Sequence, residues 1–184
     1  MELRSEASIA AGSAEIASQT DGIDLLINCA GTDARSFGAP PGERGPFDLD
    51  AETFNAVMEV NATGPMLVTK YMLPLLRAGR DAMVINVSSQ LGSMALAQTM
   101  GADTVYNVSK AALNMLSLKT ATAVRDDGIG VVMIHPGWVR TDMGGPSAAL
   151  TVDESANAIV DTIESLSIED SGRFIRWDGT DHPW

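Results

Sequence analysis

The sequence is poor in cysteine, in basic residues and in long apolar segments. Its single cysteine, Cys29, excludes an intramolecular disulfide and a metal site built from clustered cysteines. The 12 Lys and Arg residues against 24 Asp and Glu give a net charge of -12, which disfavours nucleic acid and anionic membranes as partners. No apolar run approaches the roughly 18 residues of a spanning helix, and the first residues have no apolar signal core. We therefore expect a soluble, cytoplasmic protein without a metal site.

The apolar residues gather in segments of two kinds. The 184 residues are 45% hydrophobic, enough for the core of one domain over residues 1–184. Short apolar runs predict buried strands, and the longer stretches between them predict helices. Strands are expected at residues 23–30, 82–88, 129–135 and 173–177, and helices at 7–20, 51–79, 104–126 and 152–166. Pro65 lies inside the second helix and predicts a bend near residues 61–65, because proline removes a helical hydrogen bond.

This alternation of strands and helices predicts a doubly wound α/β fold with a parallel sheet. In such sheets ligands bind beyond the carboxyl ends of the strands. Small and polar residues follow the first three strands, at residues 28–31, 88–89 and 135–137. We expect the functional site at this edge of the sheet.

Tyr106 and Lys110 form the most informative pair of side chains. They are four residues apart at the start of a predicted helix, so they lie on one face of it. A nearby ammonium favours the phenolate and is expected to lower the pKa of Tyr106 from about 10. Tyr106 would then be usable as an acid or base near neutral pH.

Five short motifs follow one another in a fixed order along the chain. They are NCAG at 28–31, VN with a following glycine at 60–64, INVSSQLG at 85–92, YNVSK at 106–110 and HPGWVRTDM at 135–143. Together they resemble the short-chain dehydrogenase/reductase family, and within it the C-factor-like branch and the sniffer-type carbonyl reductases. The resemblance implies a Rossmann-like fold. It also implies hydride transfer between NAD(P) and a carbonyl or alcohol carbon of a small-molecule substrate.

The resemblance further implies roles for individual residues. Tyr106 would exchange a proton with the substrate oxygen, Lys110 would assist Tyr106 and hold the nicotinamide ribose, and Ser89 would hydrogen-bond the substrate oxygen. Asn61 would hold a water in a proton relay to Lys110. Cofactor contacts would come from Asn28, Ala30, Gly31, Tyr106, Lys110, Pro136, Gly137, Val139 and Thr141, and an apolar substrate pocket from Met94, Leu96, Met100, Trp138 and Met143. The helices at 51–79 and 104–126 would form a homodimer interface.

The chain departs from the family pattern in three respects, the first being a longer stretch between Ser89 and Tyr106. Cys29 replaces an asparagine of the turn at 28–31 and is expected to be a small, buried packing residue, with a reactive thiol as the alternative. The family's glycine-rich phosphate loop is absent, so we expect an N-terminally truncated domain without its first two βα units, about 60 residues. Affinity for a cofactor pyrophosphate should then be weak, and the strand at 23–30 should be an exposed edge.

Three functional hypotheses stay open from the sequence. The first is an NAD(P)-dependent oxidoreductase that uses Asn61, Ser89, Tyr106 and Lys110. The second is a non-catalytic, C-factor-like signalling or interaction protein. The third is an incomplete gene product that is unable to bind cofactor. The residues that choose between NAD and NADP belong to the absent region, and no motif identifies the substrate.

Overall fold

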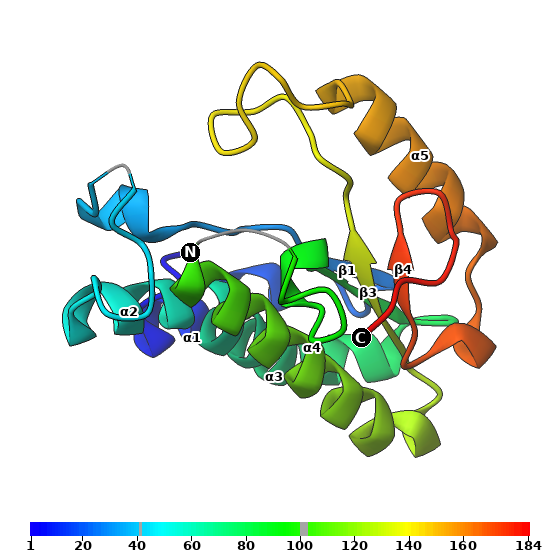
Figure 1. Cartoon of the computed structure of the whole chain (residues 1–184). Coiled ribbons are helices and arrows are strands. Elements are labelled where there is room, and N and C mark those ends of the chain that lie inside the picture. The colour runs from blue at the N-terminus through cyan, green and yellow to red at the C-terminus, as the bar shows by residue number, and fades with distance from the viewer. Residues whose placement is uncertain (41, 100–102) are drawn as a thin grey trace.

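Four parallel strands form one sheet with helices on both faces (Figure 1). The computed structural model describes residues 1–40, 42–99 and 103–184. The strands are β1 (Leu25–Asn28), β2 (Met83–Val87), β3 (Gly130–His135) and β4 (Phe174–Arg176), and they lie in this order across the sheet. The helices are α1 (Glu6–Ala17), α2 (Ala51–Met58), α3 (Gly64–Ala78), α4 (Thr104–Ala123) and α5 (Val152–Ser165). The predicted α/β, Rossmann-like arrangement is confirmed.

The two faces of the sheet have separate apolar cores. On one face, α3 and α4 pack against Val84 and Val131, and α1 lies beside α3. On the other face, α5 covers Ile85 and Val132. Because β2 and β3 are buried on both faces, their sequences are continuous apolar runs and do not alternate.

The expected bend in the second predicted helix is a change of helix type. The segment Glu59–Thr63 is a single π-helical turn between α2 and α3. Pro65 lies in the first turn of α3, where its missing N–H costs little. The wider turn carries Asn61, whose side chain is completely buried. Such turns are frequent at functional sites, because they redirect one side chain without ending the helix.

Buried amides connect the ends of the central strands to the helices. The Asn28 amide nitrogen donates to Oδ1 of Asn86 on the neighbouring strand at 2.8 Å. The Asn86 amide nitrogen donates to Oγ of Ser117 on α4 at 2.7 Å. A buried polar group is costly unless it is paired. This chain of hydrogen bonds therefore favours one register between β1 and β2 and one position of α4 against them.

β1 is the edge of the sheet, as expected. Leu25 and Ile27 are 43% and 45% exposed, although their register partners Met83 and Ile85 are buried under α5. Cys29 lies two residues after Ile27, on the same side of the extended chain, and it is exposed. The prediction that Cys29 is a buried packing residue is wrong, because the described residues place no helix over β1 on the face that α5 covers elsewhere.

Candidate active site

Ser89, Tyr106 and Lys110 meet at the carboxyl end of β2. Ser89 follows the strand by two residues, and its hydroxyl accepts a hydrogen bond from the Leu91 amide at 3.1 Å. Tyr106 lies in the first turn of α4, where its amide donates to the N-cap carboxylate of Asp103. The Lys110 ammonium lies 5.8 Å from the centre of the Tyr106 ring. The structure thus brings Ser89, Tyr106 and Lys110 together through two neighbouring elements.

Lys110 is buried, although it carries an ammonium group. Its side chain is 2% exposed, and Nζ donates to the carbonyl oxygen of Val87 at 2.8 Å. Burial lowers its pKa from 10.5 to about 8. Lys110 can therefore exchange a proton much closer to neutral pH than a lysine on the surface can.

The pKa of Tyr106 moves in the opposite direction to the prediction. Burial raises it above 10, and the charges of Asp33 and Asp103 raise it further. Ser89 partly offsets this increase by hydrogen bonding to the phenol. The prediction that Lys110 lowers the Tyr106 pKa is wrong for this structure, because loss of hydration and the charges of Asp33 and Asp103 outweigh the lowering by Ser89. Tyr106 is therefore a protonated phenol at neutral pH.

Asn61 connects the site to the turn that follows β1. Its Oδ1 accepts from the Thr32 amide at 2.8 Å, and its Nδ2 donates to the Thr32 carbonyl at 2.7 Å and to Ser109 Oγ at 2.9 Å. A Cβ placed on Gly31 would lie 3.4 Å from Lys110 Nζ and 3.7 Å from Asn61 Oδ1. Asn61, Gly31 and Lys110 are therefore neighbours, and only a residue without a side chain leaves the space between them open.

The loop after β3 forms the opposite wall of the site. Pro136 is held by the Ser155 hydroxyl, which donates to its carbonyl at 2.7 Å. Gly137 has φ +87°, and a side chain there would collide with Leu150. Val139 pairs with Leu150 in a short parallel bridge, and the Thr141 hydroxyl accepts from the Gly144 amide at 3.1 Å. These contacts hold the predicted cofactor segment as a defined loop.

The remaining predicted cofactor residues lie at the end of β1. Asn28 is buried in the chain of amides, whereas Ala30 is exposed at the same edge of the sheet. Of the five residues expected to form an apolar substrate pocket, Met143 and Trp138 lie in the loop after β3, and Met94 is largely exposed. Met100 lies outside the described residues.

The sequence interpretation missed two charged residues, Asp33 and Arg35, in the loop after β1. Asp33 is buried, and its carboxylate accepts hydrogen bonds from Arg35 Nε at 2.8 Å and Nη2 at 2.6 Å. Both residues lie just after the motif at 28–31. Their position close behind a strand end was an available signal, but they match no motif.

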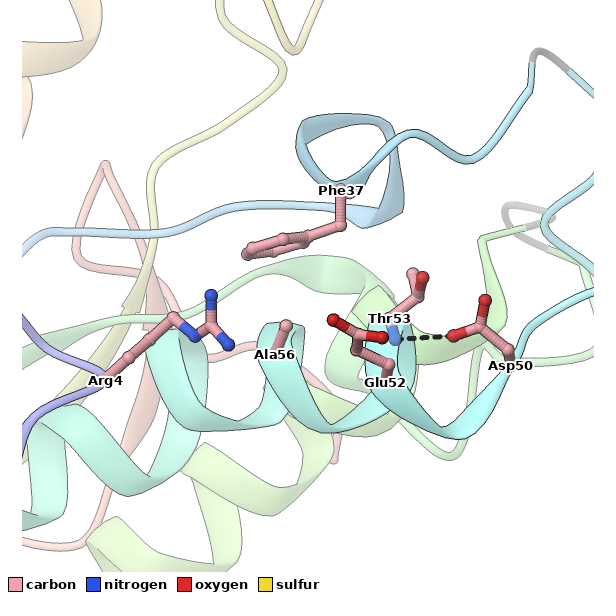
Figure 2. A pocket seen from close by; sticks show the side chains of 6 residues that line it. All are labelled: Arg4, Phe37, Asp50, Glu52, Thr53 and Ala56. Atoms are coloured by element: carbon pink, nitrogen blue, oxygen red, sulfur yellow. Dashed lines mark hydrogen bonds between the residues drawn. The ribbon is translucent and has the colours of Figure 1, made fainter.

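A separate cavity of about 240 Å³ lies at the start of α2 (Figure 2). The Phe37 ring stands over α2, and the Arg4 guanidinium lies 5.4 Å from its centre. The Asp50 carboxylate accepts from the Thr53 amide at the other end of the cavity. None of the predicted site residues lines this cavity.

The described residues contain neither a metal-binding cluster nor a membrane-spanning helix. No group of three or more His, Cys, Asp or Glu side chains is placed to hold a metal ion there. Within the same residues, no helix has both the length and the apolar character needed to cross a membrane.

The chain is similar to known oxidoreductases over most of its length. A family model described as short chain dehydrogenase matches residues 1–150. C-signal of Myxococcus xanthus is 41% identical over 165 residues, which cover 90% of this chain and 95% of that protein. Other curated relatives are longer, and the chain spans 61% of the length of one that is 35% identical.

Solved structures show the same relationship. An NADPH-bound carbonyl reductase from chicken fatty liver superposes with a TM-score of 0.89 at 34% identity. The carbonyl reductase Sniffer of D. melanogaster superposes with a TM-score of 0.89 at 32% identity. The alignments cover all of this chain and 75% and 76% of those two chains. The similarities to C-signal and Sniffer confirm the predicted branch.

Proposed function

The chain belongs to the short-chain dehydrogenase/reductase family, and we propose that it transfers a hydride between a nicotinamide cofactor and a carbonyl or alcohol carbon. One observation carries the proposal: Ser89, Tyr106 and the buried Lys110 converge at the carboxyl end of β2. Bound NAD(P)H supplies the hydride. The protein's part is to orient the substrate oxygen and to deliver a proton to it.

The proton chemistry favours carbonyl reduction at neutral pH. Tyr106 keeps its proton because its pKa is raised, so the phenol donates to a carbonyl oxygen. Ser89 donates a second hydrogen bond to that oxygen, where negative charge develops. Lys110, with a pKa of about 8, then restores the Tyr106 proton, and Asn61 with Thr32 connects Lys110 to solvent through a water.

The residues present fit the nicotinamide half of the cofactor. Gly31 leaves space beside Lys110 and Asn61 that a Cβ would partly fill, and this space suits the ribose hydroxyls. The carboxamide would be held by Val139 and Thr141, with Pro136 and Gly137 shaping the loop and Asn28, Ala30 and Gly31 along the adenosine side. None of the described residues forms a glycine-rich turn for the pyrophosphate, so Lys110 and the two loops carry the binding that this chain provides.

A fluorescence titration followed by a steady-state assay tests the proposal. NADPH and NADH are titrated against the chain, and ketone reduction is followed by loss of nicotinamide absorbance. Tyr106→Phe should lower turnover by about 10²- to 10⁴-fold while cofactor affinity is retained, because it removes only the proton donor. Tyr71→Phe is the matched control, since the Tyr71 hydroxyl bonds Glu6 on the surface. Equal turnover in both variants would contradict the proposal.

Similarity to C-signal supports a second candidate, a non-catalytic interaction protein. The match covers 95% of that protein, more than it covers of the reductases. The same titration separates the two candidates. Micromolar binding of either cofactor would favour the enzyme, and no binding up to millimolar cofactor would favour the interaction protein.

We also propose a homodimer through α3 and α4. Met66, Val108 and Met115 are exposed apolar side chains on these helices, which supports a partner surface there. Light scattering on a sizing column should give twice the monomer mass, and Met115→Glu should give a monomer. A monomeric wild-type chain would contradict this proposal.

A further inference from the structure

A cavity of about 370 Å³ lies between the two loops of the candidate active site. It is lined by Asp33, Arg35 and Ser36 from the loop after β1 and by Asp142 and Met143 from the loop after β3. We call it the Arg35 cavity. It is large enough for a small organic molecule, and it belongs to the same edge of the sheet as Ser89 and Tyr106.

Arg35 is held rigidly but keeps free donors. Its backbone amide, Nε and Nη2 all donate to the buried Asp33 carboxylate, at 2.9, 2.8 and 2.6 Å. Nη2 also donates to the Met143 carbonyl at 3.1 Å, which connects the two walls. Nη1 has no hydrogen-bond partner among residues 1–40, 42–99 and 103–184, and the side chain is 41% exposed. Arg35 therefore offers N–H groups to a ligand at a fixed place.

The charges around the cavity disfavour an anion. Asp33 cancels the charge of Arg35, and Asp142 adds a carboxylate that pairs with no described basic side chain. The lining thus has a net charge of -1, and the donors that it offers are Arg35 Nη1 and the Ser36 hydroxyl. An uncharged oxygen accepts these hydrogen bonds without the repulsion that a carboxylate meets at Asp142.

The cavity is also close to the proposed proton donor. The loops after β1 and β3 line the cavity, and in the sheet these two strands flank β2, whose carboxyl end carries Ser89. A substrate whose carbonyl meets Tyr106 can therefore extend toward Arg35.

We propose that the Arg35 cavity selects carbonyl compounds that carry a second, uncharged oxygen acceptor, such as a keto ester, over the corresponding keto acids. The proposal rests on the proposed reductase function and names its substrate class.

Three ketones test it: ethyl 3-oxobutanoate, 3-oxobutanoate and 2-pentanone. The wild-type chain should prefer the ester to the acid. Arg35→Met should lower the ratio of kcat/KM for the ester to kcat/KM for 2-pentanone about tenfold. A tenfold change is the effect expected from losing one hydrogen bond to a charged donor at a half-exposed site. The effect should appear in KM. Arg140→Met, in the same wall but outside the cavity lining, should keep the wild-type ratio.

Asp142→Asn gives a second and independent measurement. It should improve kcat/KM for the acid several-fold and narrow the preference for the ester, because it removes the repelling charge. An unchanged ratio in Arg35→Met, or a wild-type preference for the acid, would overturn the proposal.

A binding experiment distinguishes failure of this inference from failure of the reductase function. The chain is labelled with methyl-¹³C methionine, and the Met143 signal is assigned with Met143→Leu. Titration with ethyl 3-oxobutanoate should shift this signal in the wild type and less in Arg35→Met, whether or not any ketone is reduced. Turnover of 2-pentanone with no shift of the Met143 signal would refute ester binding in the Arg35 cavity but not the reductase function. A shift without turnover would refute the reductase function alone.

Discussion

Replacing Lys110 by methionine should stabilise the fold at neutral pH, although it removes a residue proposed to be essential. Burial lowers the Lys110 pKa from 10.5 to about 8. One pH unit corresponds to about 1.4 kcal/mol, so burying the charged form costs about 3 kcal/mol at pH 7. Methionine avoids that cost but loses the hydrogen bond to the Val87 carbonyl, which is worth about 1 kcal/mol. The net gain expected is about 2 kcal/mol.

The pH dependence identifies the cause of this gain. Below pH 8 the lysine is charged in both the folded and the unfolded chain, and the full cost applies. Between pH 8 and 10.5 the folded chain releases the proton that the unfolded chain keeps, so the wild-type free energy of unfolding rises. The advantage of about 2 kcal/mol should therefore disappear near pH 9.5, because the wild type gains about 1.4 kcal/mol per pH unit above pH 8.

Urea unfolding followed by far-UV circular dichroism at pH 7 and pH 10 measures both effects. Lys119→Met is the matched control, because Lys119 is exposed on the same helix. It should change the unfolding free energy by less than about 0.5 kcal/mol at either pH. A Lys110→Met variant that is less stable than the wild type by the same amount at both pH values would refute the reasoning.

Three further predictions concern the site's surroundings. Burial and the neighbouring His182 lower the His135 pKa from 6.5 to about 3. Below pH 6.5 the unfolded chain therefore binds a proton at this histidine that the folded chain does not bind. The free energy of unfolding should then fall by about 1.4 kcal/mol for each pH unit below 6.5. His135→Gln should remove this dependence of the unfolding free energy on pH, measured by urea unfolding between pH 4 and 6. An unchanged pH dependence would mean that other groups cause it. Gly137→Ala should destabilise the chain by about 1–3 kcal/mol in thermal unfolding, because its φ is +87° and Leu150 occupies the side-chain position; a melting temperature equal to wild type would show that the loop adapts. Cys29 should react with a maleimide in the folded chain as fast as in urea, as judged by mass spectrometry, since it is exposed; strong protection would contradict the open edge at β1.

Strong local patterns explain why the elements could be predicted. The apolar runs at residues 82–88 and 129–135 correspond to β2 and β3, because strands buried on both faces are built mainly from apolar residues. The break around Asn61 was also visible, since Pro65 cannot continue a regular helix.

Cys29 and Tyr106 were less predictable because their properties depend on distant residues. Whether Cys29 is covered depends on which helices reach β1, and nothing in the turn at 28–31 determines that. The Tyr106 pKa depends on burial and on Asp33, which is 73 residues away along the chain. Helical spacing places Lys110 near Tyr106, but it does not say which of the two groups loses more hydration.

The sequence by itself determined the parallel α/β class and the residue types that converge at one edge of the sheet, because periodicity and spacing are local properties of the chain. Only the tertiary structure decided the protonation of the site. It buries Lys110 against Val87, keeps the proton on Tyr106, and sets the Asp33–Arg35 pair across from Asp142 and Met143. These features depend on hydration and on charges brought together from separate segments, and such contacts exist only once the chain has folded.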